Sequence, residues 1–146
     1  MKFIFFEGID GIGKSTIEKS LQKRTDYAYI TADRFVISSC VYDYVLRKRT
    51  DRLKDFLHFA KELGGSDFDV ICIYLYSSNR DLARKRFEEN LEKEKIVTMK
   101  NEDFNQLYNL YELFVDLLEN VHVHKIDVFE KTIDQICEEI YSQIDE

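Results

Sequence analysis

Proline is absent from the 146-residue sequence, and so are a Ser/Gly-rich linker, an internal repeat and a low-complexity tract. These absences leave no sequence signal for a boundary between domains. A chain of this length also has no room for a second full hydrophobic core. We therefore predict a single domain over residues 1–146.

Long apolar runs and an excess of positive charge are missing as well. The first apolar run stops at Glu7, which makes it too short for a signal peptide or a membrane span. We expect a cytoplasmic protein without membrane contact. The net charge of −7 argues against general binding to nucleic acids, although it leaves room for a local basic site.

Cysteine is scarce, and its three residues share no spacing typical of a metal site. Cys40 and Cys137 fall in apolar helical stripes, and Cys72 falls in an apolar strand pattern. Free cysteine behaves as a small apolar residue in such places. We expect three reduced thiols in the core.

Strand and helix patterns alternate along the chain. Strands are predicted over 2–7, 26–33, 69–76 and 121–127. Helices are predicted from residue 14 onward, over 37–45, over 53–63 with an end at Gly64 and Gly65, over 79–94, over 103–119 and over 129–144. This alternation predicts an α/β three-layer sandwich with about four parallel strands, right-handed crossovers and the first strand in the interior of the sheet.

Residues 8–16, GIDGIGKST, carry the pattern G-x-x-x-x-G-K-[ST] of a phosphate-binding loop, or P-loop. Glycines let the backbone take positive φ, so that successive N–H groups turn inward around a phosphate. Lys14 would place a charge near the β and γ phosphates, and the Ser15 hydroxyl suits Mg²⁺. An apolar strand precedes the loop and a helix follows it, which favours a nucleoside triphosphate site over a glycine-rich turn without a ligand.

Three blocks of the sequence, in this order, resemble the thymidylate kinases within the P-loop nucleotide kinases: GIDGIGKST, DRFVISSCVYDY and IYLYSSNRDLARKR. The chain is also similar to the deoxynucleoside kinases. The resemblance implies a P-loop NTPase fold, ATP as phosphoryl donor and Mg²⁺ as cofactor. It implies that ATP is bound by Gly8, Ile9, Asp10, Gly11, Ile12, Gly13, Lys14, Ser15 and Thr16.

The same resemblance implies roles on the acceptor side. Asp10 matches a position that contacts the 3′-hydroxyl of the acceptor sugar in thymidylate kinases. Arg34 would bridge the transferring and accepting phosphates, and Asp33 would orient Mg²⁺ through water, so that Ser15 and Asp33 are the metal candidates. Alternatively, Asp33 could cap the N-terminus of the following helix, and Arg34 could be an ordinary surface residue. The acceptor pocket would be lined by Asp10, Arg34, Phe35, Ser38, Ser39 and Tyr42, of which the last four also suit a packed helix.

Residues 79–101, called here the lid-like segment, resemble the lid of the nucleotide kinases. Phosphoryl transfer spreads negative charge over the γ-phosphoryl oxygens, and an arginine that closes on them would stabilise the transition state. Gly11 stands where another thymidylate kinase subgroup carries an arginine, so a lid arginine would have to supply that charge. The candidates are Arg80, Arg84 and Arg86, and the alternative is a solvated helix in which they pair with nearby glutamates.

Two departures from the thymidylate kinase pattern affect the acceptor side. Only a short segment separates the first helix from Asp33. The longer segment of the thymidylate kinases supplies a base-stacking phenylalanine and an arginine for the acceptor phosphate, and the same region of the deoxynucleoside kinases supplies their catalytic acid. Both are missing here. Asp43 also replaces the glutamine of the family pattern, which argues against thymine recognition.

Three functions are therefore open. The first is a kinase that converts a deoxynucleoside monophosphate, dTMP before the others, to its diphosphate. The second is a kinase for a hydroxyl group, on a deoxynucleoside or at a nucleic-acid end, and the third is a nucleotide-binding module without turnover. We expect small-molecule nucleotides as partners, and either a monomer or a homodimer.

Overall fold

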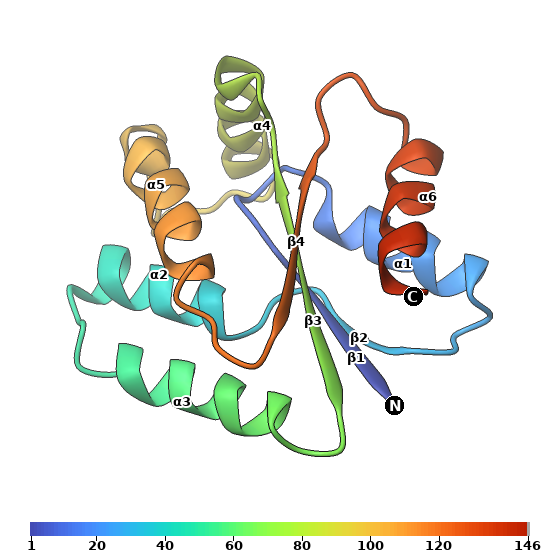
Figure 1. Cartoon of the computed structure of the whole chain (residues 1–146). Coiled ribbons are helices and arrows are strands. Elements are labelled where there is room, and N and C mark those ends of the chain that lie inside the picture. Colours follow the sequence, from blue (N-terminus) through green and yellow to red (C-terminus); the bar gives the residue numbers. More distant parts are fainter. Residues whose placement is uncertain (146) are drawn as a thin grey trace.

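A computed structural model describes residues 1–145 as a four-stranded parallel sheet with helices on both faces (Figure 1). The strands are β1 (Lys2–Glu7), β2 (Ile30–Ala32), β3 (Asp69–Tyr76) and β4 (His122–Asp127), in the order β2-β1-β3-β4. The helices are α1 (Lys14–Arg24), α2 (Val36–Arg47), α3 (Leu53–Gly64), α4 (Arg80–Lys93), η1 (Asn101–Asp103, a short 3₁₀ turn), α5 (Phe104–Val115) and α6 (Ile133–Ile144).

The helices form two layers around the sheet. In Figure 1, α1 and α6 lie on one face, whereas α2, α3 and α5 lie on the other, with α4 near the carboxyl ends of the strands on that same side. The predicted three-layer α/β sandwich is confirmed, and so is the interior position of β1. All three cysteines are buried and free, as expected.

The strand order places a switch point between β1 and β3. From β1 the chain passes through α1 to β2 at one edge, and from β3 it passes through α4 and α5 to β4 at the other edge. In open parallel sheets, ligands bind outside the carboxyl ends of the strands at such a point. The P-loop follows directly on the carboxyl end of β1.

Three element boundaries differ from the sequence prediction by four residues. Strand β2 is limited to Ile30–Ala32, because Asp26 and Tyr27 take a left-handed backbone conformation (φ of 50° and 58°) that no strand accommodates. The helix predicted over 103–119 ends at Val115. The last helix begins at Ile133 instead of 129, since Thr132 caps it: its hydroxyl accepts a hydrogen bond from the Gln135 N–H at 3.1 Å.

The buried side chains fill the space between the layers. Strand β3 is buried over most of its length, which confirms its prediction as a strand covered on both faces. Tyr44, within the helix predicted over 37–45, is exposed. Within residues 1–145, no helix combines the length and the apolar character that crossing a membrane requires.

Candidate functional site

The P-loop has the backbone conformation that its sequence predicts. Gly8, Gly11 and Gly13 have φ values of 147°, 86° and 105°, in the region that favours glycine. A side chain at Gly8 would also collide with β3, because its Cβ would lie 2.5 Å from the Leu75 carbonyl oxygen. The loop is thus packed against the end of the neighbouring strand, and α1 begins at Lys14 as predicted.

Residues of the loop, of α1 and of the β2–α2 connection surround a cavity of about 230 Å³, called here the loop cavity. The first turn of α1 supplies N–H groups that have no helical partner, which favours an anion at this place. Most of the predicted ATP and metal residues meet here. The lining consists of Asp10, Gly11, Gly13, Lys14, Ser15, Thr16, Asp33, Arg34 and Asn90.

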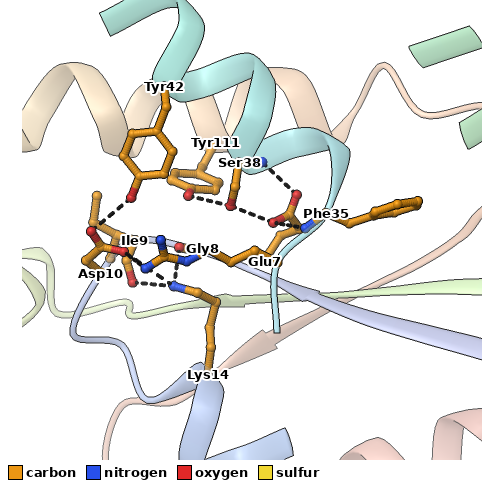
Figure 2. A network of polar contacts seen from close by, with 10 residues as sticks. Glu7, Gly8, Ile9, Asp10, Lys14, Phe35, Ser38, Tyr42 and Tyr111 are labelled. Carbon is orange, nitrogen blue, oxygen red and sulfur yellow. Dashed lines mark hydrogen bonds and ion pairs between the residues drawn. The ribbon is translucent and has the colours of Figure 1, made fainter. Parts of the chain in front are cut away.

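Lys14 is buried, and its ammonium group is held inside the loop (Figure 2). The Nζ atom donates hydrogen bonds to the carbonyl oxygens of Gly8 at 2.6 Å and Ile9 at 3.1 Å. It lies 4.0 Å from the nearer carboxylate oxygen of Asp10. Burial lowers the pKa of Lys14 to about 8.

Asp10 is 3% exposed and links the loop to the acceptor side predicted from the sequence. One carboxylate oxygen accepts a hydrogen bond from Arg34, and the other accepts one from the Tyr42 hydroxyl at 2.9 Å. The Arg34 guanidinium also lies 5.7 Å from the centre of the Tyr42 ring. Arg34 is therefore fixed beside the loop cavity, and both Asp10 oxygens are engaged.

Asp33 supplies an oxygen with no hydrogen-bond partner. Among the side-chain nitrogen and oxygen atoms buried in residues 1–145, its Oδ1 is the one that makes no hydrogen bond. Buried polar atoms are normally paired, so an unpaired carboxylate oxygen beside a ligand cavity indicates a missing partner. Mg²⁺ prefers oxygen ligands, and Asp33 and Ser15 line the same cavity. These residues fit the predicted metal.

Glu7 is a central residue that the sequence prediction missed. Its side chain is completely buried at the end of β1. The carboxylate accepts hydrogen bonds from the Phe35 N–H at 3.2 Å, the Ser38 N–H at 2.8 Å and the Ser38 hydroxyl at 2.7 Å, and Ser38 in turn lies 2.8 Å from the Tyr111 hydroxyl oxygen (Figure 2). Burial raises the pKa of Glu7. A lone acidic residue in an apolar strand directly before the P-loop was the available signal.

The predicted acceptor residues line a second cavity, of about 740 Å³, between α2 and α3. This α2–α3 cavity includes Arg34, Phe35, Ser38, Ser39 and Tyr42, and only Asp10 of the predicted set is outside it. Side chains that the sequence prediction did not include also line it: Val36, Asp43, Arg47, Arg52, Asp55, Phe56 and Phe59. The Ser38 hydroxyl is committed to Glu7 and Tyr111, which leaves it a structural part of the wall.

A third cavity, of about 680 Å³, lies between α2 and the lid-like segment. Asp10, Arg34 and Tyr42 line it on one side, and Asn90 lines both this cavity and the loop cavity. Arg34 lines all three cavities. It therefore stands where the predicted donor and acceptor sides meet.

The arginines of the lid-like segment do not reach the loop cavity. Arg80 donates a hydrogen bond to Asn109 of α5 at 2.7 Å, and its guanidinium lies 4.6 Å from the centre of the Tyr108 ring. Arg84 lies 3.5 Å from Glu88 and packs over Phe104. For Arg86, it is the backbone carbonyl that packs against Gly11. Within residues 1–145, α4 contributes Asn90 to the loop cavity instead.

Solved structures share this arrangement of sheet, loop and helices. The YorR protein of Bacillus subtilis, in complex with phosphorylated GDP, has a TM-score of 0.73 and 18% identity over 98% of this chain and 95% of its own. Deoxyadenosine kinase from M. mycoides, with the products dCMP and a flexible dCDP, has a TM-score of 0.67 and 16% identity over 99% and 98%. The chain has the P-loop kinase fold.

At these levels of identity the likeness concerns the fold. The same deoxyadenosine kinase with bound dATP gives a TM-score of 0.63 and 18% identity over the full length of both chains. No protein-family model and no curated protein sequence matches the chain.

Proposed function

We propose that the protein is a phosphotransferase that moves the γ-phosphoryl group of ATP, with Mg²⁺, to a small-molecule nucleotide. The observation that supports this most is the convergence of three groups on the loop cavity: the buried ammonium of Lys14, the unpaired Oδ1 of Asp33 and the fixed guanidinium of Arg34. A cation, a metal-ligating oxygen and an arginine are the components that phosphoryl transfer requires.

Each residue has a role that follows from its place. The N–H groups of the loop and of the start of α1 would bind the donor phosphates, with Lys14 near the β and γ phosphates. Ser15 and Asp33 would hold Mg²⁺, which neutralises charge on the phosphates when bound. Arg34 would contact both the transferred and the accepting group, because it lines the cavities on both sides.

The proposed acceptor is a deoxynucleoside monophosphate, which becomes a diphosphate. Its phosphate is already anionic, so no side chain has to remove a proton, and positioning with charge stabilisation suffices. The deoxyadenosine kinase of the same fold holds the products dCMP and a flexible dCDP, so this fold accommodates deoxynucleoside mono- and diphosphates. The resemblance of the sequence to thymidylate kinases makes dTMP the first acceptor to test.

A lid arginine remains part of the proposal. Arg80 and Arg84 are engaged with α5 and with Glu88, so either would reach the transferred group only after α4 moves. Arg86 belongs to the turn of α4 that packs on Gly11. Loss of turnover with intact ATP binding in Arg86→Ala, and not in Arg80→Ala or Arg84→Ala, would assign the role to Arg86.

A second candidate is phosphorylation of a hydroxyl group on a deoxynucleoside. The likeness in fold to a deoxyadenosine kinase favours it, and the α2–α3 cavity of about 740 Å³ has room for a nucleoside. This reaction benefits from a general base, and Asp33 would have to serve. Asp33→Asn would abolish transfer to a nucleoside but preserve part of the transfer to a monophosphate.

A substrate panel tests the proposal. Purified protein, Mg²⁺ and ATP are mixed with all deoxynucleosides, their monophosphates and a short DNA with a 5′-hydroxyl, and mass spectrometry reports which mass gains a phosphate. A diphosphate product supports the proposal, and a new monophosphate or phosphorylated DNA favours the hydroxyl kinase. ATP binding without any phosphorylated product would contradict both, and would leave a nucleotide-binding module.

A further inference from the structure

We propose that the α2–α3 cavity holds the base of the acceptor nucleotide, and that Arg47 and Arg52 select a base with two adjacent hydrogen-bond acceptors on one edge, guanine or cytosine. The inference rests on the proposed function, because it names the acceptor class of that site. It assigns specificity to Arg47 and Arg52, which the sequence pattern did not place in the site, and to Asp43, which replaces the glutamine of the family pattern.

Asp43 is a buried carboxylate on which both arginines converge. One of its oxygens accepts hydrogen bonds from Arg47, at 2.9 Å, and from Arg52, while the other accepts one from the Arg52 Nε at 2.8 Å. These hydrogen bonds, those from Arg52 above all, lower the pKa of Asp43. Asp43 is thus ionised, both of its oxygens are occupied, and the two guanidinium groups are fixed relative to each other.

The sequence folds this way because the chain reverses between α2 and α3. Arg47 lies one helical turn beyond Asp43, so that the two share a face of α2. Lys48 then takes a left-handed conformation (φ 55°), and the Arg49 N–H donates to the Asp43 carbonyl oxygen at 3.0 Å. This turn brings Arg52, at the start of α3, back to the Asp43 side chain.

Aromatic side chains form the apolar part of the same cavity. Phe35, Phe56 and Phe59 line it. The Phe35 and Phe59 rings meet edge to face, with centres 5.7 Å apart, and the Arg52 guanidinium lies 5.6 Å from the centre of the Phe56 ring. Phe59 is 54% exposed, so that part of its ring is open to solvent. Exposed aromatic faces beside fixed guanidinium groups are suited to stacking a nucleobase.

The free hydrogen-bonding groups of the arginines determine which bases fit. The contacts with Asp43 use two of the five N–H donors of Arg52 and one of the five of Arg47. The other N–H groups of both arginines can donate hydrogen bonds to a ligand, and neither guanidinium can accept one. A guanidinium fork matches two adjacent acceptors, as O6 and N7 of guanine provide. N3 and O2 of cytosine form an equivalent pair.

Adenine and thymine lack such an edge. Adenine places an amino group beside N7 and beside N1, and thymine places its N3–H between O2 and O4. Each of these edges therefore satisfies one N–H of a guanidinium fork, whereas the edges of guanine and cytosine satisfy two. Asp55, the second carboxylate that lines the cavity, can accept a hydrogen bond from the amino group of guanine or cytosine. The site therefore ranks dGMP and dCMP above dTMP as acceptors.

The position of the α2–α3 cavity would let the nucleotide whose base it holds also receive the phosphoryl group. Arg34 and Tyr42 line both the α2–α3 cavity and the cavity on the lid side, and Arg34 also lines the loop cavity. A nucleotide with its base against Phe56 and Phe59 would extend its phosphate toward Arg34. The acceptor phosphate would then lie beside the donor phosphates at Lys14.

The test measures kcat/KM for dGMP, dCMP, dAMP and dTMP at saturating ATP, in the wild type and in Arg47→Gln and Arg52→Gln. We expect dGMP or dCMP to exceed dTMP and dAMP by about tenfold to a hundredfold, as one bidentate contact provides. Each substitution should remove most of this preference, mainly through KM, because the values for dGMP or dCMP fall more than the values for dTMP. Arg49→Gln is the matched control, because Arg49 pairs with Asp51 and is outside the cavity.

The ratio of kcat/KM for dGMP to that for dCMP identifies which base edge, O6 and N7 of guanine or N3 and O2 of cytosine, the arginines bind. A preference for dTMP or dAMP would overturn the inference, and so would an equal loss for all four acceptors in the arginine variants. If no acceptor is phosphorylated, the proposed function fails, and calorimetry with the four monophosphates tests the base site alone. Binding of dGMP or dCMP that Arg52→Gln weakens tenfold, with thermal unfolding unchanged, would still support the site, and equal binding of all four would refute it.

Discussion

The ammonium of Lys14 lies 2.6 Å from the carbonyl oxygen of Gly8, inside the loop that its own sequence motif defines. It is 5% exposed, and the partners that surround it in the free protein are carbonyl oxygens and the Asp10 carboxylate. A phosphate group would bring a stronger negative charge to the same place. The protonation of Lys14 is therefore coupled to nucleotide binding.

The first prediction concerns the pH dependence of nucleotide affinity. The pKa of Lys14 is about 8 in the free protein because burial disfavours its charge, and bound phosphates would raise it. Below about pH 7.5 the affinity for ADP should be constant; above pH 8 it should fall by up to tenfold per pH unit, since binding then requires uptake of a proton. Calorimetry with EDTA, without Mg²⁺, measures this effect apart from the metal.

Two variants serve as controls for the pH experiment. Lys14→Ala should bind ADP weakly and without the fall above pH 8. Lys19→Ala, on the exposed side of α1, should behave as the wild type. An affinity of the wild type that stays constant up to pH 9.5 would refute the account of Lys14.

The second prediction concerns Glu7. Glutamine at this position would place an amide N–H against donors from Phe35 and Ser38, so Glu7→Gln should lower the free energy of unfolding by about 1–3 kcal/mol at pH 7. The folded state keeps the Glu7 proton to a higher pH than the unfolded state, because burial raises its pKa above 4.5. The stability that protonation provides is full below about pH 4.5 and is lost as the pH rises through the folded pKa.

The difference in stability between wild type and Glu7→Gln should therefore widen as the pH falls from 7 toward 4.5. Urea denaturation at several pH values measures it, with Glu92→Gln on the exposed face of α4 as the control. A difference below 0.5 kcal/mol at every pH would mean that the buried network has no role in holding α2.

The third prediction concerns Arg34. Arg34→Gln should lower kcat by about a hundredfold to a thousandfold, as the loss of one group that stabilises transition-state charge does. ADP affinity should change only slightly, because the contacts of Lys14 with the loop are retained. Steady-state kinetics and calorimetry separate the two effects. Arg24→Gln is the control, since Arg24 pairs with Asp134 of α6 and is outside the cavities. A decrease in kcat below fivefold would exclude Arg34 from the transfer step.

The fourth prediction concerns the tip of the loop. Gly11 has a φ of 86°, and a Cβ there would lie 2.7 Å from the Arg86 carbonyl oxygen. Gly11→Ala should lower the free energy of unfolding by about 1–3 kcal/mol and weaken ADP binding. Gly65→Ala should be nearly neutral, because its Cβ would have no neighbour closer than 3.5 Å and its φ is −87°. Equal stability of the two variants would contradict the close packing of α4 on the loop.

The sequence predicted those features that contiguous residues encode. The P-loop is one short segment whose glycines, lysine and serine act together, and the strand and helix patterns repeat with fixed periods. The predicted acceptor residues Phe35, Ser39 and Tyr42 line one cavity, because Ser39 and Tyr42 lie in α2 and Phe35 directly precedes it. The short strand β2 was overestimated, since a left-handed turn at Asp26 and Tyr27 has no distinct signal there.

Contacts between distant segments could not be predicted in this way. Tyr111 joins Glu7 through Ser38, and Arg52 reaches Asp43 through a reversal of the chain, and neither pairing has a local pattern. For the lid arginines, contacts with α5 compete with a contact to the phosphate, and the sequence does not show which of the two forms. Their spacing suits a phosphate contact, but Tyr108 and Asn109 of α5 hold Arg80 on another side of α4.

The most direct test of the central claim follows the phosphoryl group itself. ATP labelled in its γ-phosphate is mixed with Mg²⁺, excess protein and the four deoxynucleoside monophosphates, and the label is followed over a single turnover in wild type, Lys14→Ala and Lys19→Ala. The account predicts that wild type and Lys19→Ala move the label to a diphosphate, whereas Lys14→Ala does not. Label that stays on ATP or appears only as free phosphate in the wild type, while ATP binds, would contradict it.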